Sequence, residues 1–233
     1  MKLTFSLSYY NQGVDALKKH LNIWKQYDKN IKKEINFIII DDGSKIPLEK
    51  LIKDIDLEDL NINLYRVEVD LYCNIAGVRN LSARECNTEW MLILDMDTLV
   101  PAKMAGDLIN IINKQEKGKA YKFNRLVPSN NRDNKHYKIH PAVCLIRKED
   151  YWKVGGCEED LVGHYGGTDP SFFYKARDKI KVEIYKNIFL IHLYEGEADI
   201  IRDTSHNIKL IEEKKRTNNW STDYIRFSWK KVI

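Results

Sequence analysis

The sequence predicts an α/β fold in which a mostly parallel central sheet is flanked by helices. Short apolar runs alternate with helix-like stretches through the first hundred residues, an order typical of right-handed βαβ units. Residues 35–40 are apolar almost without interruption, as expected for a strand that is covered on both faces. A length of 233 residues with 43% apolar residues is sufficient to bury a substantial core.

The first half of the chain is expected to contain four strands with helices between them. Leu17, Leu21 and Trp24 recur at helical spacing and mark the first helix. The expected strands are 3–7, 35–40, 62–69 and 90–94, and the expected helices are 14–27, 48–57 and 75–86.

The pattern changes after Pro101, where a helix is expected to run to about residue 117. The polar segment 128–138 is expected to be a loop, and a glycine-rich turn and a short helix lie between the last two strands. The expected strands are 121–127, 142–146 and 182–193, followed by a charged helix after Asp203 and a mixed aromatic and basic segment, 220–229. No linker is evident, so one domain is expected over 1–233.

The composition narrows the class of partner and the compartment. The net charge of +4, from 38 basic and 34 acidic residues, is too small to indicate nucleic acid binding, but it suits an anionic small substrate or contact with an acidic membrane surface. The four cysteines have no CxxC spacing and are expected to be buried thiols. No apolar stretch is long enough to span a bilayer or form a signal-peptide core, so a cytoplasmic location is expected, with peripheral membrane contact left open.

Two carboxylates, Asp41 and Asp42, follow the apolar run 35–40 and precede Gly43-Ser44. Parallel sheets bind ligands at the carboxyl ends of their strands, where such carboxylates can accept hydrogen bonds from a base or a ribose. The alternative is an ordinary Asp-Gly turn that needs no ligand.

A second acidic pair, Asp95-Met96-Asp97, closes the run 90–94. Two carboxylates separated by one residue can share a divalent ion, Mn²⁺ or Mg²⁺, with a diphosphate. The alternatives are that Asp97 caps the helix expected to begin near Pro101, or that both residues lie in a solvated turn. A lone histidine, His192, ends another apolar run and would favour Mn²⁺ if it lay beside the ion.

Glycines and acidic residues gather twice in the second half, at 155–160 and at 165–169. Glycine allows a close approach of the backbone to a sugar, and Asp169 is placed to take a proton from a hydroxyl. The alternative is that Asp169 and Pro170 form the N-cap and first residue of a helix.

These motifs resemble, in their order, those of family 2-like glycosyltransferases of the GT-A (nucleotide-diphospho-sugar transferase) fold. The second half resembles the galactosyltransferase and chondroitin polymerase type. The matching segments are Ser8-Tyr9-Tyr10-Asn11 (first nucleotide loop), Asp41-Asp42-Gly43-Ser44 (DDGS), Ala76-Gly77-Val78-Arg79-Asn80 (AxxRN), Leu94-Asp95-Met96-Asp97 (DxD), Val154-Gly155-Gly156-Cys157-Glu158-Glu159 (VGGFDE), Tyr165-Gly166-Gly167-Thr168-Asp169 (WGGED) and Ile191-His192-Leu193 (strand with the metal histidine).

The resemblance implies a nucleotide-binding half, 1–100, and an acceptor-binding half, 101–233. It implies donor contacts at Ser8, Tyr10, Asn11, Asp41, Asp42, Arg79 and Asp95, acceptor contacts at Tyr165, Gly166, Gly167 and Thr168, metal ligands Asp97 and His192, and Asp169 as the general base. Thr168 stands where the family usually has glutamate, and Tyr165 stands where it usually has tryptophan.

The resulting hypothesis is metal-dependent transfer of a sugar, with inversion, from a nucleotide sugar to a glycan or other hydroxyl acceptor, with a UDP-sugar as the favoured donor. A nucleotidyltransferase is one alternative, although residues 9–13 lack the basic side chains that grip a triphosphate. A non-catalytic sugar-binding module of the same fold is the other. Residues 194–205 are expected to form a lid that becomes ordered when donor binds.

Overall fold

The structure is a computed structural model that describes residues 1–11, 14–57, 59–114, 117–127, 136–193 and 200–233. Its strands are β1 Leu3–Tyr9, β2 Ile35–Asp41, β3 Ile62–Val67, β4 Trp90–Leu94, β5 Thr98–Leu99, β6 Lys119–Val127, β7 His136–Arg147, β8 Lys181–His192 and β9 Trp229–Lys231. Its helices are α1 Val14–Lys25, α2 Lys29–Lys32, α3 Leu48–Ile52, α4 Ile75–Glu85, α5 Ala102–Ile112, α6 Lys148–Val154, α7 Thr168–Ala176 and α8 Ser205–Thr217, with a 3₁₀ turn η1 at Glu159–Leu161.

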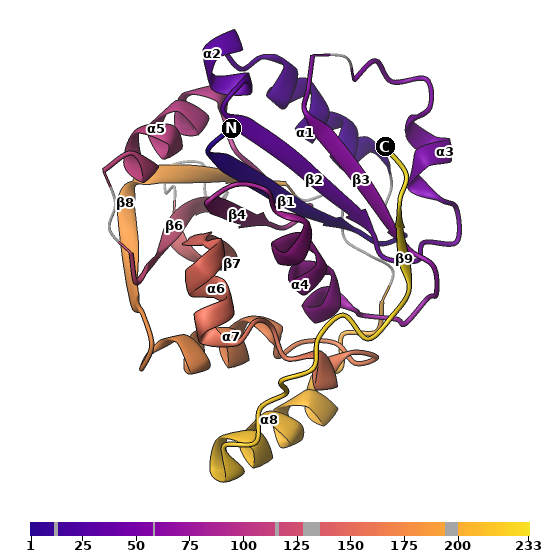
Figure 1. The fold of residues 1–233 in the computed structure, drawn as a ribbon, viewed down its shortest axis with the longest axis vertical. Helices are drawn as coiled ribbons and strands as arrows, with labels where there is room; N and C mark the ends of the chain where they lie inside the picture. Colours follow the sequence, from indigo (N-terminus) through magenta and orange to yellow (C-terminus); the bar gives the residue numbers. More distant parts are fainter. Residues whose placement is uncertain (12–13, 58, 115–116, 128–135, 194–199) are drawn as a thin grey trace.

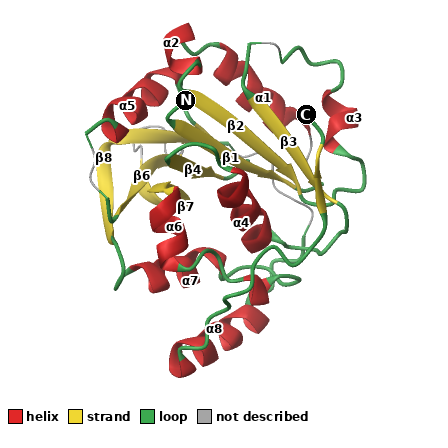
Figure 2. Cartoon of the chain, in the orientation of Figure 1, coloured by secondary structure: helices red, strands yellow, loops and turns green. Residues whose placement is uncertain are grey.

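The described strands form one sheet in the order β5-β8-β6-β7-β4-β1-β2-β3-β9. Strands β4, β1, β2 and β3 are parallel, which confirms the βαβ units expected from the sequence. Strand β7 then joins β4 antiparallel, whereas β6 and β8 are parallel to each other. The sheet is therefore mixed, with a parallel core and antiparallel additions on both sides (Figure 2).

Helices cover both faces of this sheet (Figure 1). Helices α1, α3 and α5 contribute to one core cluster with β1 and β2, and α4, α6 and α7 contribute to clusters on the other face. The apolar residues that mark the first expected helix, Leu17, Leu21 and Trp24, are all buried there. Trp24 stacks on Phe37 of β2 with ring centroids 4.3 Å apart, so α1 packs against the centre of the parallel strands.

Several expected boundaries were wrong. Helix α3 covers only the first five residues of the expected 48–57, because Asp54 and Asp56 favour turns over a helix interior. Helix α5 ends at Ile112, and β7 begins at His136, inside the segment expected to be a loop. Most of that loop, 128–135, lies outside the described residues. Strands β5 and β9 were not expected, because two or three residues are too short to show a period.

The C-terminal segment returns to the first half of the molecule. Strand β9 pairs antiparallel with β3 and covers the edge that β3 would otherwise present (Figure 1). Just before it, Phe227 packs on α4 so closely that a Cβ at Gly77 would lie 2.5 Å from its ring. The sheet that carries the first half is thus completed by the last residues of the second half.

The cysteines are buried and free, as expected from their spacing. Within the described parts of the chain, no helix combines the length and apolar character needed to cross a bilayer.

Candidate active site

A cleft of about 260 Å³ lies where the carboxyl ends of β1 and β4 face the amino end of α7. Most of the site residues expected from the sequence line it: Ser8, Arg79, Asp95, Asp97, Tyr165, Gly166, Gly167, Thr168 and Asp169. The structure therefore brings the DxD segment and the YGGTD segment, about seventy positions apart in the chain, into one site.

Arg79 connects these two segments at the centre of the cleft. Its Nη1 donates to Asp169 Oδ1 at 2.6 Å and its Nη2 donates to Asp95 Oδ1 at 3.0 Å. Burial on its own would lower the pKa of Arg79, but the carboxylates of Asp169 and Asp95 raise that pKa well above its ordinary value. The guanidinium is a fixed positive charge that holds one carboxylate from each half of the chain.

Asp169 does not cap α7, so that alternative was wrong. The helix begins at Thr168, and its N-cap is Gly167, which has a left-handed backbone with φ 87°. Asp169 is therefore inside the first turn, where its side chain reaches Arg79 in the cleft. A carboxylate in this place remains accessible to a molecule bound in the cleft.

Asp97 lies beside two histidines. Its Oδ2 is 3.5 Å from His192 Nδ1, and the side-chain ligand atoms of Asp95, Asp97 and His140 all lie within 4.8 Å of one another. Burial, followed by the charge of Asp95, raises the pKa of Asp97, as expected where a cation would complete the site. Carboxylates with an imidazole form a donor set that fits Mn²⁺ or Mg²⁺. The N-cap of α5 is Pro101, so Asp97 does not cap that helix.

His140 was not expected from the sequence. Its Nε2 lies 2.9 Å from Thr98 Oγ1, and its Nδ1 faces the backbone N–H groups of Ala142 and Val143 at 3.1 and 3.0 Å. Burial, helped by the charge of Arg125, lowers the pKa of His140 to about 3. The imidazole is therefore neutral at physiological pH.

His20 of α1 and Tyr27, two residues beyond its end, hold the segment after β4 from the opposite side. His20 Nε2 donates to Met96 O at 2.9 Å, and Tyr27 Oη donates to Val100 O at 2.6 Å. Burial lowers the pKa of His20 to about 4, so its ring is neutral. Both residues lie within the expected helix 14–27, but Tyr27 follows the end of α1, so helical spacing does not identify this pair.

The acidic pair after β2 is arranged differently. Asp41 is fully buried and accepts hydrogen bonds from the backbone N–H groups of Ser44 and Leu48 and from the guanidinium of Arg66. Asp42 accepts a hydrogen bond from Asn74 Nδ2 at 3.0 Å, and burial raises its pKa to about 7. Asp41 thus stabilises the turn, and its expected contact with a donor stays a prediction.

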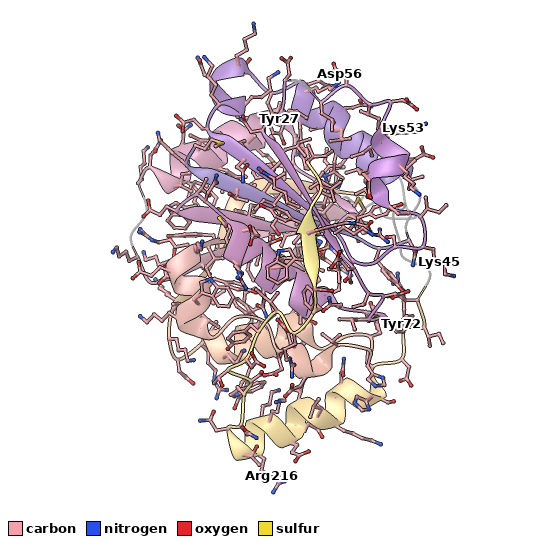
Figure 3. The ribbon with its side chains drawn as sticks, turned by 45° about the vertical axis from the view of Figure 1, so that its right-hand side comes forward. Tyr27, Lys45, Lys53, Asp56, Tyr72 and Arg216 are labelled. Atoms are coloured by element: carbon pink, nitrogen blue, oxygen red, sulfur yellow. The ribbon has the colours of Figure 1, made fainter. Side chains whose placement is uncertain are left out.

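Tyr10 and Asn11 line a second cleft of about 480 Å³ beside this turn. Tyr10 Oη donates to Asp70 Oδ1 at 3.0 Å, and its ring meets Tyr72 edge to face at 6.5 Å. Tyr72 is labelled in Figure 3 between the sheet and α8. Asn11 receives the backbone N–H of Lys45 on its Oδ1 at 2.8 Å, so the first loop and the turn after β2 are joined.

The two glycines of the YGGTD segment make room for α8 as well as for the cleft. A Cβ at Gly166 would lie 2.8 Å from Thr204, and a Cβ at Gly167 would lie 2.6 Å from Ile211. The buried Asn207 of α8 donates from Nδ2 to the carbonyl groups of Leu161, His164 and Gly166. Helix α8 therefore fixes the loop that carries Tyr165, which the sequence motif did not reveal.

Asn80 and the acidic run 158–160 are structural. Asn80 Oδ1 accepts from Cys157 N and Tyr151 Oη, and its Nδ2 donates to Cys157 O and Glu159 Oε1. Glu158, Glu159 and Asp160 then bind the C-terminal segment through Ser221 N, Ile225 N and Lys214 Nζ. The AxxRN segment and the acidic run 158–160 thus together hold the C-terminal segment in place.

The expected lid lies partly outside the described residues, since 194–199 are not described. Ile200 and Arg202 line the cleft, and Ile201 N donates to Tyr72 Oη at 2.6 Å. The described end of this segment thus connects the acceptor side of the cleft with the second cleft.

The fold and this cleft define a glycosyltransferase of the GT-A fold. The profile of glycosyl transferase family 2 matches residues 7–182. The chain belongs to that family, and its fold and enzyme class, expected from the motifs, are confirmed. A nucleotidyltransferase is not supported by this match. No curated protein matches the sequence.

Solved structures share this fold at low sequence identity. The TarS fragment 1-349 of S. aureus, solved with UDP-GlcNAc, aligns with a TM-score of 0.69 and 15% identity over 95% of this chain and 68% of that one. GalNAc-T7 with UDP, GalNAc and Mn²⁺ aligns with a TM-score of 0.66 and 14% identity, over 91% of this chain and 48% of that one. The mannosyltransferase PcManGT from Pyrobaculum calidifontis, with GDP-Man and Mn²⁺, aligns with a TM-score of 0.61 and 15% identity, over 95% of this chain and 66% of that one.

Proposed function

We propose that this chain transfers a sugar, with inversion, from a nucleotide-sugar donor to a hydroxyl acceptor, and that it does so with a bound divalent ion. The observation that carries the proposal is the single cleft in which Arg79 joins Asp95 to Asp169, with Asp97 and His192 alongside. A UDP-sugar is the favoured donor, because TarS and GalNAc-T7 were solved with UDP-GlcNAc and with UDP, whereas PcManGT was solved with GDP-Man.

The donor is proposed to bind across the two clefts, against the residues that the first half, 1–100, contributes to them. The base would occupy the cleft of Tyr10 and Asn11, and the ribose would lie near Ser8 and Asp95 in the first cleft. Asp42 lines neither cleft in the structure, so its proposed donor contact would need the buried side chain to become accessible. Asp97 and His192 would hold Mn²⁺, and the ion would neutralise the charge that develops on the departing diphosphate. Asp41 would act on the donor indirectly, because its hydrogen bonds to Ser44 N and Leu48 N fix the turn that contains Asp42.

The acceptor is proposed to bind to the second half, 101–233, against Tyr165, Gly166, Gly167 and Thr168. Its hydroxyl oxygen would form a bond to the anomeric carbon while the bond to the diphosphate breaks on the opposite face, and Asp169 would take the hydroxyl proton. In the structure, Asp169 Oδ1 accepts a hydrogen bond from Arg79 Nη1. A diphosphate in the cleft would compete for that guanidinium and release the carboxylate.

The lid and the location of the protein remain proposals as well. The described residues Ile200 and Arg202 line the cleft, and the lid expected over 194–205 stays a proposal from the sequence. A cytoplasmic location with peripheral membrane contact stays a prediction from the sequence.

The test is calorimetry of UDP binding, with and without Mn²⁺, on the parent and on Asp97→Ala. The parent should bind UDP at least ten times more tightly with Mn²⁺, and Asp97→Ala should lose this difference while melting like the parent. Asp178→Ala is the matched control, since Asp178 is an exposed carboxylate that pairs with Arg177. A thermal-shift panel of nucleotide sugars with Mn²⁺ then identifies the donor. If the parent protein binds UDP with the same affinity with and without Mn²⁺, the proposed metal dependence is overturned.

A further inference from the structure

His140 is close enough to the two acidic residues of the DxD segment to suggest a third metal ligand. A ligating nitrogen must offer a lone pair to the ion. The hydrogen bonds around the ring determine whether either nitrogen of His140 has one to offer.

The first nitrogen, Nδ1, faces two backbone donors. The N–H groups of Ala142 and Val143 lie 3.1 and 3.0 Å away. Because a backbone N–H only donates, Nδ1 must be the unprotonated nitrogen, and its lone pair is already used. In a neutral ring, Nε2 then carries the hydrogen.

The second nitrogen, Nε2, faces Thr98 Oγ1 at 2.9 Å, and that hydroxyl lies 2.9 Å from Asp97 Oδ1. An ionised carboxylate only accepts hydrogen bonds, so the single hydroxyl hydrogen of Thr98 is directed at Asp97. Thr98 Oγ1 is left to accept the hydrogen of His140 Nε2. The backbone donors at His140 Nδ1 and the carboxylate of Asp97 therefore require the same order of donation: His140 donates to Thr98, and Thr98 donates to Asp97.

We propose that His140 is a positioning residue that orients Asp97 through Thr98, and that it is not itself a ligand of the ion. This inference rests on the role proposed above for Asp97. Residues that orient metal ligands by hydrogen bonds contribute about 10–100-fold to metal affinity. Thr98 also pairs with His192 across the β5–β8 ladder, so the relay fixes the carboxylate relative to the proposed histidine ligand.

The first experiment measures Mn²⁺ affinity by electron paramagnetic resonance for the parent, Thr98→Val and Thr98→Ser. Thr98→Val keeps the shape of the buried side chain and removes the relay, so Mn²⁺ binding should weaken about 10–100-fold. Thr98→Ser keeps the hydroxyl and should bind within about threefold of the parent. A parent that binds Mn²⁺, together with Thr98→Val at parental affinity, overturns the relay but not the proposed function. A parent without Mn²⁺ binding overturns both.

A double-mutant cycle separates positioning from ligation. If His140 acts through Thr98, the double variant with His140→Leu and Thr98→Val should bind Mn²⁺ no more weakly than the weaker single variant. If His140 is a ligand, the two losses should multiply, and the relay is overturned.

His140→Leu leaves two buried N–H groups without an acceptor and can fail to fold, so a measurement on the unaltered protein completes the test. Long-range ¹H–¹⁵N spectra should show His140 with a hydrogen on Nε2, both alone and with saturating Mg²⁺. Loss of the Nε2 hydrogen from His140 when Mg²⁺ binds would show direct ligation and overturn the proposal.

Discussion

Strands β2 and β4 end alike in sequence but differently in structure. Each is an apolar strand with two closely spaced acidic residues at its carboxyl end: Asp41 is the last residue of β2 and Asp42 follows it, whereas Asp95 and Asp97 both follow β4. Both strands end at the same edge of the parallel sheet. The side chain of Asp41 is 0% exposed, whereas the side chains of Asp95 and Asp97 are 33% and 29% exposed. The end of β2 encloses Asp41, whereas the end of β4 leaves Asp95 and Asp97 partly exposed to the cleft.

The difference follows from where the chain goes next. After β2 it turns at Gly43 into α3, and this turn directs the N–H groups of Ser44 and Leu48 at Asp41. After β4 it continues into β5, so the acidic side chains face Arg79 and His192 from other elements. Asp41 is thus enclosed by donors of its own turn together with Arg66 of β3, whereas Asp95 and Asp97 meet Arg79 and His192 and stay partly exposed to the cleft.

Asp169 extends the comparison and carries the largest expected effect. Its side chain is 28% exposed and is held by Arg79, as Asp95 is. Asp169→Asn should slow sugar transfer by about 10²–10⁴-fold, because an amide cannot take the acceptor proton. Donor affinity should stay within a few-fold, since Arg79 keeps Asp95. The measurement is the transfer rate with Asp178→Asn as control, and a parental rate would place Asp169 with the structural carboxylates.

Asp41→Asn compared with Asp97→Asn tests the comparison directly. Asp41→Asn leaves Arg66, whose side chain is mostly buried, without its carboxylate and should cost about 3–5 kcal/mol of unfolding free energy. Asp97→Asn removes a partly exposed charge whose pKa is already raised, so metal-free stability should change by about 1 kcal/mol or less. Urea denaturation at pH 7 measures both. Equal losses would show that exposure does not separate the two strand ends.

Asp42 gives an effect that depends on pH. Its folded pKa of about 7 lies above the ordinary value of 3.8, so the folded state holds a proton that the unfolded state releases. Stability contributed by this group is full below pH 4 and is lost as the pH rises through 7. Asp42→Asn should therefore be more stable than the parent by up to about 4 kcal/mol at pH 8 and nearly equal to it at pH 4. Melting temperatures across this range check the sign, and a constant difference would contradict it.

Local patterns were sufficient to predict the core of the fold and the members of the cleft. The strands of the parallel core and the segment around Asp97 can each be recognised from a few neighbouring residues. The structure confirms that these elements exist and occur in the expected order. The supporting side chains were missed because their partners are remote. His140 reaches Thr98 across 42 positions, and Asn207 reaches Leu161 across 46, without any local periodicity at either end. The alternative of an N-cap at Asp169 was wrong, because the helix begins at Thr168 with Gly167 as its N-cap.

The pairing of β9 with β3 has a consequence for how the chain is made. Residues 62–67 leave the ribosome long before residues 229–231, so the outer edge of β3 stays open while most of the remaining chain is synthesised. Phe227 likewise reaches Gly77 only at the end. The half that carries the proposed donor site thus emerges before the strand that covers its edge, because β9 follows the acceptor half in the sequence. Biogenesis of this enzyme depends on keeping that edge from other chains until its own partner arrives.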